Sequence, residues 1–271
     1  MSHTILLERQ GGVALITLNR PQVKNALDSV TTDALVTHLR ALRNDETVRA
    51  LVVTGAGGDF CAGGDVKAMG NGDARSPEQR RAGMTRYRDL ATAMAALDKP
   101  VVAAVDGVAF GAGLGLALWA DLVLVSERVR MAMVFHRIGL IPDLGTWYTL
   151  PRVVGLPRAK ELIYSAREFG AQEALRMDLA LEVHSPDALL PRALEIAHSF
   201  EGASATAMSL SKQALQASPQ TGLNTMLDME ATAQAVAGGS EYVRESLRRF
   251  AVREPAQFRW PTDSSPLNST S

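Results

Sequence analysis

Two apolar strands, each running directly into a glycine-rich loop, constrain the fold of this chain more than any other feature. Arg49 to Thr54 is rich in valine and leucine and leads into the loop Gly55 to Gly64. Val101 to Val105 is apolar throughout and precedes the loop Gly107 to Gly115. Such runs are typical of strands buried in parallel sheets. Because the ligand crevice of an open α/β sheet lies beyond the carboxyl ends of its strands, we expect the two loops to face each other there.

The remaining pattern alternates strands with helices. Ile5 to Glu8 and Val13 to Leu18 predict an antiparallel hairpin around Gly11-Gly12. A third buried strand is expected at Leu122 to Val125, and helices are expected from the N-cap Asp28, at Met84 to Leu97 and at Leu114 to Trp119. Strands that alternate with helices in this way imply a right-handed βαβ spiral with a mostly parallel sheet.

The second half of the chain has a different character. From Arg158 to Phe250 the alanine, leucine and glutamate pattern has a helical period. The tail from Pro261 to Ser271 is rich in serine, proline and asparagine and is expected to stay disordered. We therefore divide the chain into an α/β core (1–200), a helical region (201–260) and a tail (261–271).

Composition excludes several classes of function. A net charge of −1 over 271 residues argues against a nucleic-acid partner. The longest apolar run, Val101 to Ala120, is broken by Asp106 and four glycines, so no membrane span and no signal peptide are expected. The single cysteine, Cys61, forms no internal disulfide, which favours a reducing, cytoplasmic location. The five histidines are scattered without ligand spacing, so no metal site is expected.

The loop Gly107 to Gly115 leaves two interpretations open. Glycines at a helix start let backbone N–H groups hold a phosphate or a developing oxyanion. The loop is no P-loop, because no Lys-Ser or Lys-Thr follows it. As a dinucleotide fingerprint it is weak, since Asp121 comes too early, while Glu127 is not clearly misplaced. Glycines used only for tight helix–strand packing explain the loop about as well.

Taken together, the motifs resemble the crotonase family, the enoyl-CoA hydratase/isomerase superfamily, from about residue 4 to about residue 258. The matching segments are Asn19-Arg20-Pro21 with Asn25-Ala26-Leu27, Thr54 to Met69, Ala103 to Asp121, Ile138 to Gly155, and Phe250 with Arg253-Glu254-Pro255. The resemblance implies a spiral of ββα units followed by a helical trimerisation region, assembled as a trimer or a dimer of trimers. It also implies an acyl-CoA thioester substrate, with coenzyme A entering as part of that substrate and no separate cofactor.

The same resemblance implies a set of site residues. Two backbone N–H groups, those of Gly64 and Ala112, would form an oxyanion hole. The coenzyme A nucleotide would lie along Val23 to Ala26 and Ala62 to Asp65, so Lys24, Ala26, Ala62 and Asp65 are candidate substrate-binding residues. Lys24 has two equally good interpretations: its ammonium group pairs with a phosphate of coenzyme A, or it is a solvated lysine on the surface.

Departures from the family pattern bear on the reaction. The two water-activating glutamates of the family's hydratases fall here on Gly115 and Phe135, which argues against ordinary hydration. Asp143 instead follows Pro142, where isomerases of the ring-epoxide phenylacetyl-CoA and 3-enoyl to 2-enoyl type carry a catalytic aspartate. In 4-chlorobenzoyl-CoA dehalogenase the matching aspartate is a nucleophile. The dehalogenase also needs a histidine before the second loop, and this chain has none between His38 and His136.

Asp143 is thus the candidate catalytic side chain. Its neighbours are Ile138, Leu140, Ile141, Leu144 and Trp147, and desolvation among them is expected to raise its pKa and make it a base. As an alternative, Asp143 caps the helix that begins near Gly145. The preferred hypothesis is an acyl-CoA isomerase. Nucleophilic chemistry at Asp143 and a non-catalytic thioester-binding protein are the alternatives.

Three further residues, Phe135, His136 and Trp147, are candidates for lining the substrate pocket. Phe135 and His136 are adjacent in an expected strand, so their side chains would face opposite sides.

Overall fold

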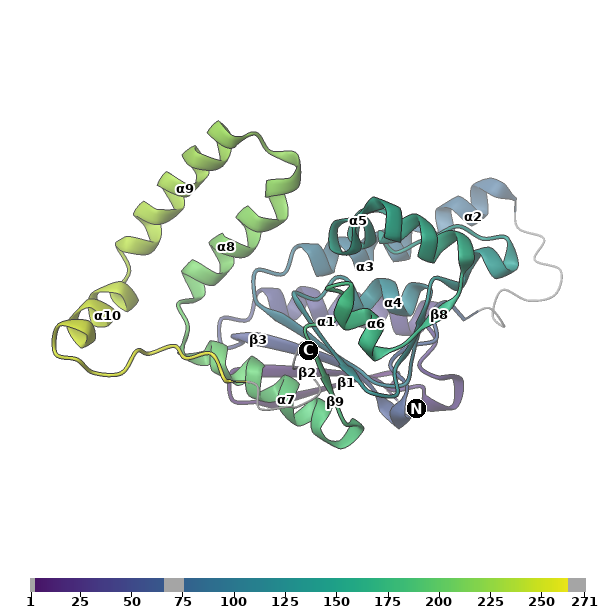
Figure 1. Cartoon of the computed structure of the whole chain (residues 1–271), viewed down its shortest axis with the longest axis horizontal. Helices are drawn as coiled ribbons and strands as arrows, with labels where there is room; N and C mark the ends of the chain where they lie inside the picture. The colour runs from purple at the N-terminus through teal and green to yellow at the C-terminus, as the bar shows by residue number, and fades with distance from the viewer. Residues whose placement is uncertain (1–2, 66–75, 263–271) are drawn as a thin grey trace.

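The computed structural model describes residues 3–65 and 76–262 and contains two sheets (Figure 1). The strands are β1 (Ile5–Gln10), β2 (Val13–Leu18), β3 (Ala50–Gly55), β4 (Val101–Val105), β5 (Val108–Phe110), β6 (Leu122–Ser126), β7 (Arg130–Ala132), β8 (Glu168–Phe169) and β9 (Glu182–His184). The main sheet has the order β1-β2-β3-β4-β6-β9, and the second sheet has the order β5-β7-β8.

Helices cover the main sheet and continue beyond it. The α-helices are α1 (Ser29–Arg43), α2 (Pro77–Gly83), α3 (Thr85–Ala95), α4 (Ala112–Ala117), α5 (Thr146–Ser165), α6 (Ala171–Arg176), α7 (Pro186–Ser199), α8 (Ala205–Ala217), α9 (Leu223–Gly238) and α10 (Glu241–Ala251). Short 3₁₀ helices are η1 (Pro21–Val23), η2 (Ala56–Gly58), η4 (Val134–Ile138), η5 (Phe200–Gly202) and η6 (Ser218–Gln220). No helix in the described ranges is long and apolar enough to cross a bilayer.

The main sheet has the predicted topology. β1 and β2 pair antiparallel around Gly11-Gly12, so the hairpin is confirmed. Every other pairing in this sheet, from β2–β3 to β6–β9, is parallel. Asp28 caps α1 as predicted, because its side chain accepts a hydrogen bond from the Thr31 amide at 2.8 Å. The core is therefore an α/β fold with one antiparallel edge.

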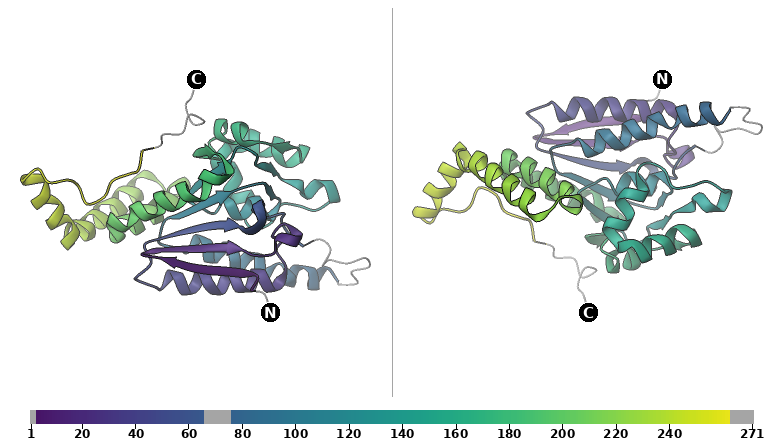
Figure 2. Two further views of the ribbon diagram at one scale, coloured as in Figure 1. Left: turned by 90° about the horizontal axis from the view of Figure 1, so that it is seen from below. Right: turned by 90° about the horizontal axis from the view of Figure 1, so that it is seen from above.

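Both faces of the main sheet are buried, which explains the continuous apolar runs. Along β2, Ala14, Ile16 and Leu18 face one core, while Val13 and Leu15 face the other. The first core lies under α1, α3 and α4, and the second lies under α7 (Figure 2). Side chains alternate between the faces of a strand, so a strand covered on both sides must be apolar at every position.

The predicted second glycine loop is only partly a loop. Val108 to Phe110 form strand β5, and α4 begins at Ala112, two residues before the predicted start at Leu114. β4, β5 and α4 form one ββα unit, and β6, β7 and α5 form the next. Each unit adds one strand to each sheet, and this repetition produces the expected spiral.

Helices α8 to α10 form an arm that extends away from the core (Figures 1 and 2). After α10 the chain returns to the core as a strap, residues 252–262, where Phe258 and Trp260 pack against Phe200 at ring-centroid distances of 6.1 and 6.0 Å. Leu215, Leu223 and Phe250 of the arm are more than two-thirds exposed in the single chain. The role of the arm in trimer formation stays a prediction.

A buried ionic cluster holds the end of the strap. The Arg192 guanidinium donates to both carboxylate oxygens of Glu182, at 2.8 and 2.9 Å, and His184 contacts Glu182 at 2.8 Å. Arg192 also donates to the carbonyl oxygens of Pro261 and Thr262 at 3.1 and 3.4 Å. Pro261 and Thr262, the first two residues of the predicted disordered tail, therefore have carbonyls that Arg192 satisfies, while the disorder of the tail stays a prediction. Residues 263–271 lie outside the described residues.

Replacement of Arg192 tests this cluster. Arg192→Met is expected to lower the free energy of unfolding by about 3–5 kcal/mol, because it leaves the Glu182 carboxylate buried without its main counter-charge. Urea unfolding measures the change. Glu195 also pairs with Arg192 but is 57% exposed, so the control Glu195→Gln is expected to cost less than about 1 kcal/mol. Equal effects of the two substitutions would contradict a stabilising role of the buried pair.

Candidate active site

The loops that follow β3 and β4 lie against each other, as the sequence predicts. The Phe60 amide donates to the Asp106 carbonyl at 2.8 Å. Cys61 then pairs with β5. Its amide donates to the Val108 carbonyl at 2.9 Å, and its carbonyl accepts from the Phe110 amide at 3.0 Å. The loop after β3 is therefore joined to the second sheet by backbone hydrogen bonds, which fix its position relative to α4.

Two glycines permit this close approach. A Cβ atom on Gly63, whose φ is +97°, would lie 2.7 Å from the Phe110 carbonyl oxygen and 3.4 Å from the Ala112 nitrogen. A Cβ atom on Gly113 would lie 2.1 Å from the Cys61 carbonyl oxygen. Real Cβ atoms do not approach so closely, so neither position accepts a side chain without a shift of the backbone. Helix–strand packing therefore explains Gly113 without a bound nucleotide.

The amides of Gly64 and Ala112 are left available by this arrangement. On either side of Gly64, the backbone is bonded to Leu27. The Leu27 amide donates to the Gly63 carbonyl at 2.8 Å, and the Leu27 carbonyl accepts from the Asp65 amide at 3.0 Å. The Gly64 amide takes part in neither hydrogen bond. Ala112 is the first residue of α4, where helix geometry leaves the N–H without an intrahelical acceptor. Within the described part of the chain, neither amide has a hydrogen-bond acceptor.

The segment after β2 closes one side of this region. Asn25 is 1% exposed, and its side-chain amide donates to the carbonyls of Ala56 and Asp59 at 2.9 and 2.6 Å. Arg20 donates to the Ala26 carbonyl at 2.6 Å and pairs with Asp65 at 3.1 Å. Sequence reasoning gave Arg20 and Asn25 no role. The segment Asn19 to Asn25 is mostly polar, so no pattern in the sequence distinguished these two side chains.

The candidate coenzyme A residues occupy this segment and the facing loop. Lys24 is half exposed, and its ammonium group lies 3.4 Å from the Asp59 carboxylate. The Lys24 carbonyl accepts a hydrogen bond from the Ala62 amide at 2.9 Å, while Ala26 is buried. The structure thus brings Lys24, Ala26, Ala62 and Asp65 together. The exposed head group of Lys24 fits both interpretations given above.

Asp143 is held in a partly buried turn before α5 and does not cap that helix. The N-cap position is Gly145, and no side chain caps it. Asp143 Oδ1 is buried and has no hydrogen-bond partner among the described residues. Burial raises the pKa of Asp143 to about 6 from its usual 3.8. The capping alternative is therefore wrong, and the predicted direction of the pKa shift is confirmed.

The cause of this burial differs from the prediction. Ile138, Leu140, Ile141 and Trp147 are all exposed in the chain, and only Leu144 of the expected neighbours is buried. These four residues lie between the end of η4 and the start of α5. Helix α4 covers the turn instead: Trp119 Nε1 donates to the Leu144 carbonyl at 2.8 Å, and Gly115 packs on Leu144 and Thr146.

Tyr87 of α3 is partly buried and packs against the core beneath α1, α3 and α4. Burial raises the pKa of its hydroxyl, and the negative charges of Asp143 and Asp65 raise this pKa further.

Phe135 and His136 point apart, but not for the predicted reason. Their segment is the 3₁₀ helix η4 rather than a strand. Phe135 is buried, and a Cβ on Gly111 would lie 3.5 Å from its ring, next to Ala112. His136 is exposed and stacks on Tyr164 with ring centroids 6.1 Å apart. Phe135 therefore lies beside the start of α4, and His136 lies away from it.

Cysteine and metal chemistry find little support. Cys61 is fully buried, and this burial raises the pKa of its thiol to about 12, so the thiol stays protonated at neutral pH. In the ranges 3–65 and 76–262, no group of three or more histidine, cysteine, aspartate or glutamate side chains is arranged to hold a metal ion.

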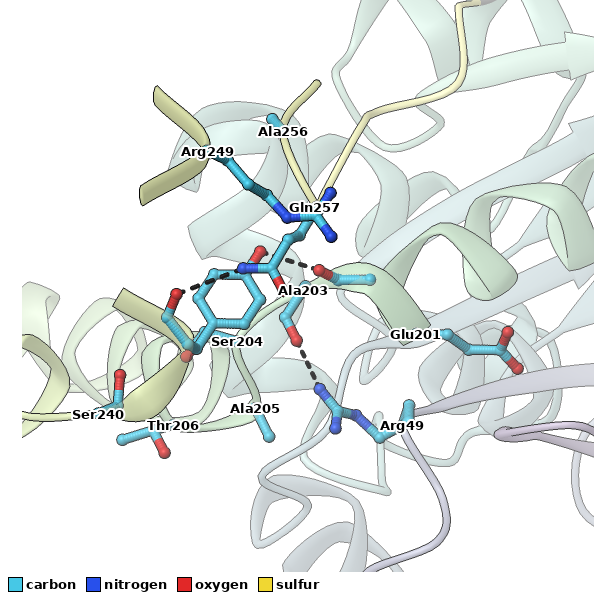
Figure 3. A pocket seen from close by; sticks show the side chains of 12 residues that line it. Arg49, Glu201, Ala203, Ser204, Ala205, Thr206, Ser240, Arg249, Ala256 and Gln257 are labelled. Carbon is cyan, nitrogen blue, oxygen red and sulfur yellow. Dashed lines mark hydrogen bonds between the residues drawn. The ribbon is translucent and has the colours of Figure 1, made fainter. Parts of the chain in front are cut away.

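A separate cavity of about 500 Å³ lies at the hinge between core and arm (Figure 3). Its lining includes Arg49, Ser204, Ser240, Arg249 and Gln257, and the Arg49 guanidinium donates to the Ala203 carbonyl. None of the predicted site residues lines it. This cavity therefore belongs to the junction of the arm with the core and not to the region around Asp143.

Comparisons with known proteins agree with the fold. Residues 8–261 match the model of the family described as enoyl-CoA hydratase/isomerase. The 1,2-epoxyphenylacetyl-CoA isomerase of Escherichia coli K12 is 35% identical over 95% of this chain and 99% of the relative. A probable enoyl-CoA hydratase of Rhodobacter capsulatus is 38% identical over 94% and 98%. A crystal structure of an enoyl-CoA hydratase/isomerase from Cupriavidus metallidurans CH34 superimposes with a TM-score of 0.91 at 40% identity, covering 96% and 98%.

Alanine at position 113 tests the packing of α4 on the loop after β3. Gly113→Ala is expected to lower the free energy of unfolding by about 3 kcal/mol, because the new methyl group meets the Cys61 carbonyl. The control is Gly238→Ala in α9, where nothing lies within 4 Å of the added Cβ. The free energy of unfolding of that variant should rise by up to about 1 kcal/mol, because alanine has a higher helix propensity than glycine. A Gly113→Ala protein as stable as wild type in urea would refute the packing argument.

Proposed function

Since the chain belongs to the enoyl-CoA hydratase/isomerase family, we propose that it is an acyl-CoA isomerase that uses Asp143 as its acid–base group. The observation that carries the proposal is the Asp143 carboxyl, which has one buried oxygen without a hydrogen-bond partner among the described residues and a raised pKa. The relatives include proteins named for isomerase and for hydratase activity, so the choice between these reactions rests on the residues of this chain.

The proposed first step is removal of a proton from carbon. The Asp143 carboxylate takes a proton from a carbon next to, or vinylogous to, the thioester carbonyl, and the electron pair moves to the thioester oxygen. The amides of Gly64 and Ala112 donate hydrogen bonds to that enolate oxygen. In enzymes of known mechanism, loss of one such donor costs roughly 2.7–4 kcal/mol of transition-state stabilisation. The protonated Asp143 then returns the proton to a different carbon, and the double bond migrates without net gain or loss of a proton.

The residues that surround Asp143 support proton transfer over hydration. Gly115 and Phe135 occupy the positions where the family resemblance places the two hydratase glutamates, and neither can activate water. The Asp143 carboxyl is available instead, and desolvation makes it a stronger base than an exposed aspartate. Phe135 beside Gly111 adds an apolar wall next to the Ala112 amide, which favours an acyl group with an apolar or aromatic body.

Proton exchange tests the proposed base. Asp143→Asn is expected to reduce deuterium uptake from deuterated water into the acyl chain by at least about 10³-fold, because general acid–base catalysis contributes on that order. Mass spectrometry on a panel of enoyl-CoA and arylacetyl-CoA thioesters measures the uptake, and calorimetry checks that binding is retained. At pH 7 the variant should be at least as stable as wild type, since it loses a buried carboxylate without a partner.

Three results would redirect this assignment. Equal exchange in wild type and Asp143→Asn would exclude Asp143 as the base. An acyl or aryl adduct on the Asp143 peptide would identify it as a nucleophile. Release of 3-hydroxyacyl-CoA from an enoyl-CoA without double-bond migration would identify a hydratase.

The pH dependence gives an independent check on Asp143. Only its ionised form accepts a proton, and burial raises its pKa to about 6. We therefore expect kcat/KM to rise about tenfold per pH unit below 6 and to reach a plateau above about 7. Steady-state rates between pH 5 and 8.5 measure this profile. Rates that are unchanged from pH 5 to 7 would mean that the rate-determining group is not this carboxyl.

A further inference from the structure

The turn that carries Asp143 adopts a backbone conformation that needs support. Leu144 has φ +50° and Gly145 has φ +72°, so two consecutive residues are left-handed between Asp143 and α5. A non-glycine residue in this region costs roughly 1–2 kcal/mol relative to ordinary backbone, and it persists only where surrounding contacts hold it. The direction of the Asp143 side chain therefore depends on whatever holds Leu144.

Trp119, just after α4, makes the contacts that hold this turn. Its indole N–H donates a hydrogen bond to the Leu144 carbonyl at 2.8 Å. Its six-membered ring covers Gly145 so closely that a Cβ there would lie 2.7 Å from the ring. On the other side of the turn, the Thr146 amide donates to the Asp143 carbonyl at 2.9 Å, and the Thr146 hydroxyl donates to the same oxygen. The carbonyls of Asp143 and Leu144 are thus both fixed.

Helix α4 also packs on this turn directly. A Cβ on Gly115 would lie 2.9 Å from the Thr146 hydroxyl and 3.5 Å from Leu144 Cβ. The same helix begins at Ala112, whose amide is one of the two proposed oxyanion donors. The proposed donor, Ala112, and the two residues that contact the turn, Gly115 and Trp119, therefore lie on α4 and the turn that directly follows it.

A second aromatic ring fixes the orientation of Trp119. Tyr148 of α5 stacks on it, with ring centroids 6.1 Å apart and an angle of 11° between the planes. Tyr148 is itself held by Arg152, which lies 3.5 Å over its ring, and its hydroxyl accepts a hydrogen bond from Gln220 at 3.2 Å. The indole has few alternative orientations, so its N–H stays directed at Leu144.

We propose that Trp119 is a positioning residue, whose indole N–H acts through the Leu144 carbonyl to aim the Asp143 carboxyl in register with the Ala112 amide. This inference rests on the proposed role of Asp143 as the base. Trp119 does not touch the reacting atoms in this scheme. It sets the geometry between a base on a turn and a donor on a helix, and proton transfer depends steeply on that geometry.

The variant Trp119→Phe tests the proposal, because it keeps an aromatic ring against Tyr148 and removes only the N–H donor and part of the ring. We expect kcat for proton exchange to fall about 10- to 100-fold, since small misplacements of catalytic groups have effects of this size. KM for the same thioester should change less than about twofold, because the proposed donors Gly64 and Ala112 are retained. Trp260→Phe is the matched control, since Trp260 packs on Phe200 in the strap, and both constants should stay at wild-type values.

A second readout does not depend on turnover. Carbon-13 NMR of protein labelled at aspartate side chains follows the titration of Asp143, whose signal is assigned by its loss in Asp143→Asn. In Trp119→Phe we expect the midpoint to move from about 6 toward the usual aspartate value, because a loosened turn lets water reach the carboxyl. An unchanged titration together with an unchanged kcat would overturn the role of Trp119.

The two readouts separate this proposal from the proposed function. Absence of Asp143-dependent exchange in wild type would refute the base, while the titration would still report whether Trp119 holds the turn. If the wild type shows Asp143-dependent exchange while Trp119→Phe leaves both kcat and the Asp143 titration unchanged, this result would support Asp143 as the base and refute the positioning role of Trp119. A parallel loss of kcat and of thioester binding would instead indicate that the substitution disrupts the site as a whole, and this result would also count against the proposal.

Discussion

The contact between helix α4 and the loop after β3 is the constraint on which the rest of the site depends. The backbone of Cys61 pairs with β5 and, at the same point, meets Gly113 of α4 with no room for a side chain. This backbone contact sets the position of Gly64 relative to Ala112, and the Asp59 carboxylate adds to it by accepting a hydrogen bond from the Val108 amide at 2.9 Å. Because backbone amides are fixed by the fold, they require no reorganisation when charge develops beside them.

The same helix determines the environment of Asp143. Gly115 and Trp119 bring α4 against the turn, and their contact leaves one carboxylate oxygen buried without a partner. Burial of such a group costs folding free energy, and catalytic groups commonly carry this cost. Any side chain at position 115 would meet Thr146 and Leu144. A glutamate at that position, which the family resemblance assigns to hydratases, would therefore compete with this turn for space.

The arm and the strap are held by a different kind of interaction. Apolar side chains of α8 to α10 remain exposed in the single chain, whereas the strap is fixed to the core by stacked rings and by the buried pair of Arg192 and Glu182. The cavity at the hinge is lined by groups that already bond across the junction, such as Arg49 with Ala203 (Figure 3). Through Gln220 and Tyr148 the arm also contacts the stack that supports Trp119.

The sequence alone determined the architecture, because period and apolarity act locally. The hairpin, the buried strands, the N-cap Asp28 and the two glycine loops were all predictable, and so was the raised pKa of a carboxyl in an apolar segment. Tertiary structure decided which residues that lie far apart in the sequence come into contact. Ile138 to Ile141 turned out exposed, and the contacts that hold the turn after Asp143 come from Gly115 and Trp119, more than 20 residues earlier in the chain. No periodicity in the sequence marks Trp119 as the donor to Leu144, because that hydrogen bond exists only once α4 and the turn before α5 have packed together.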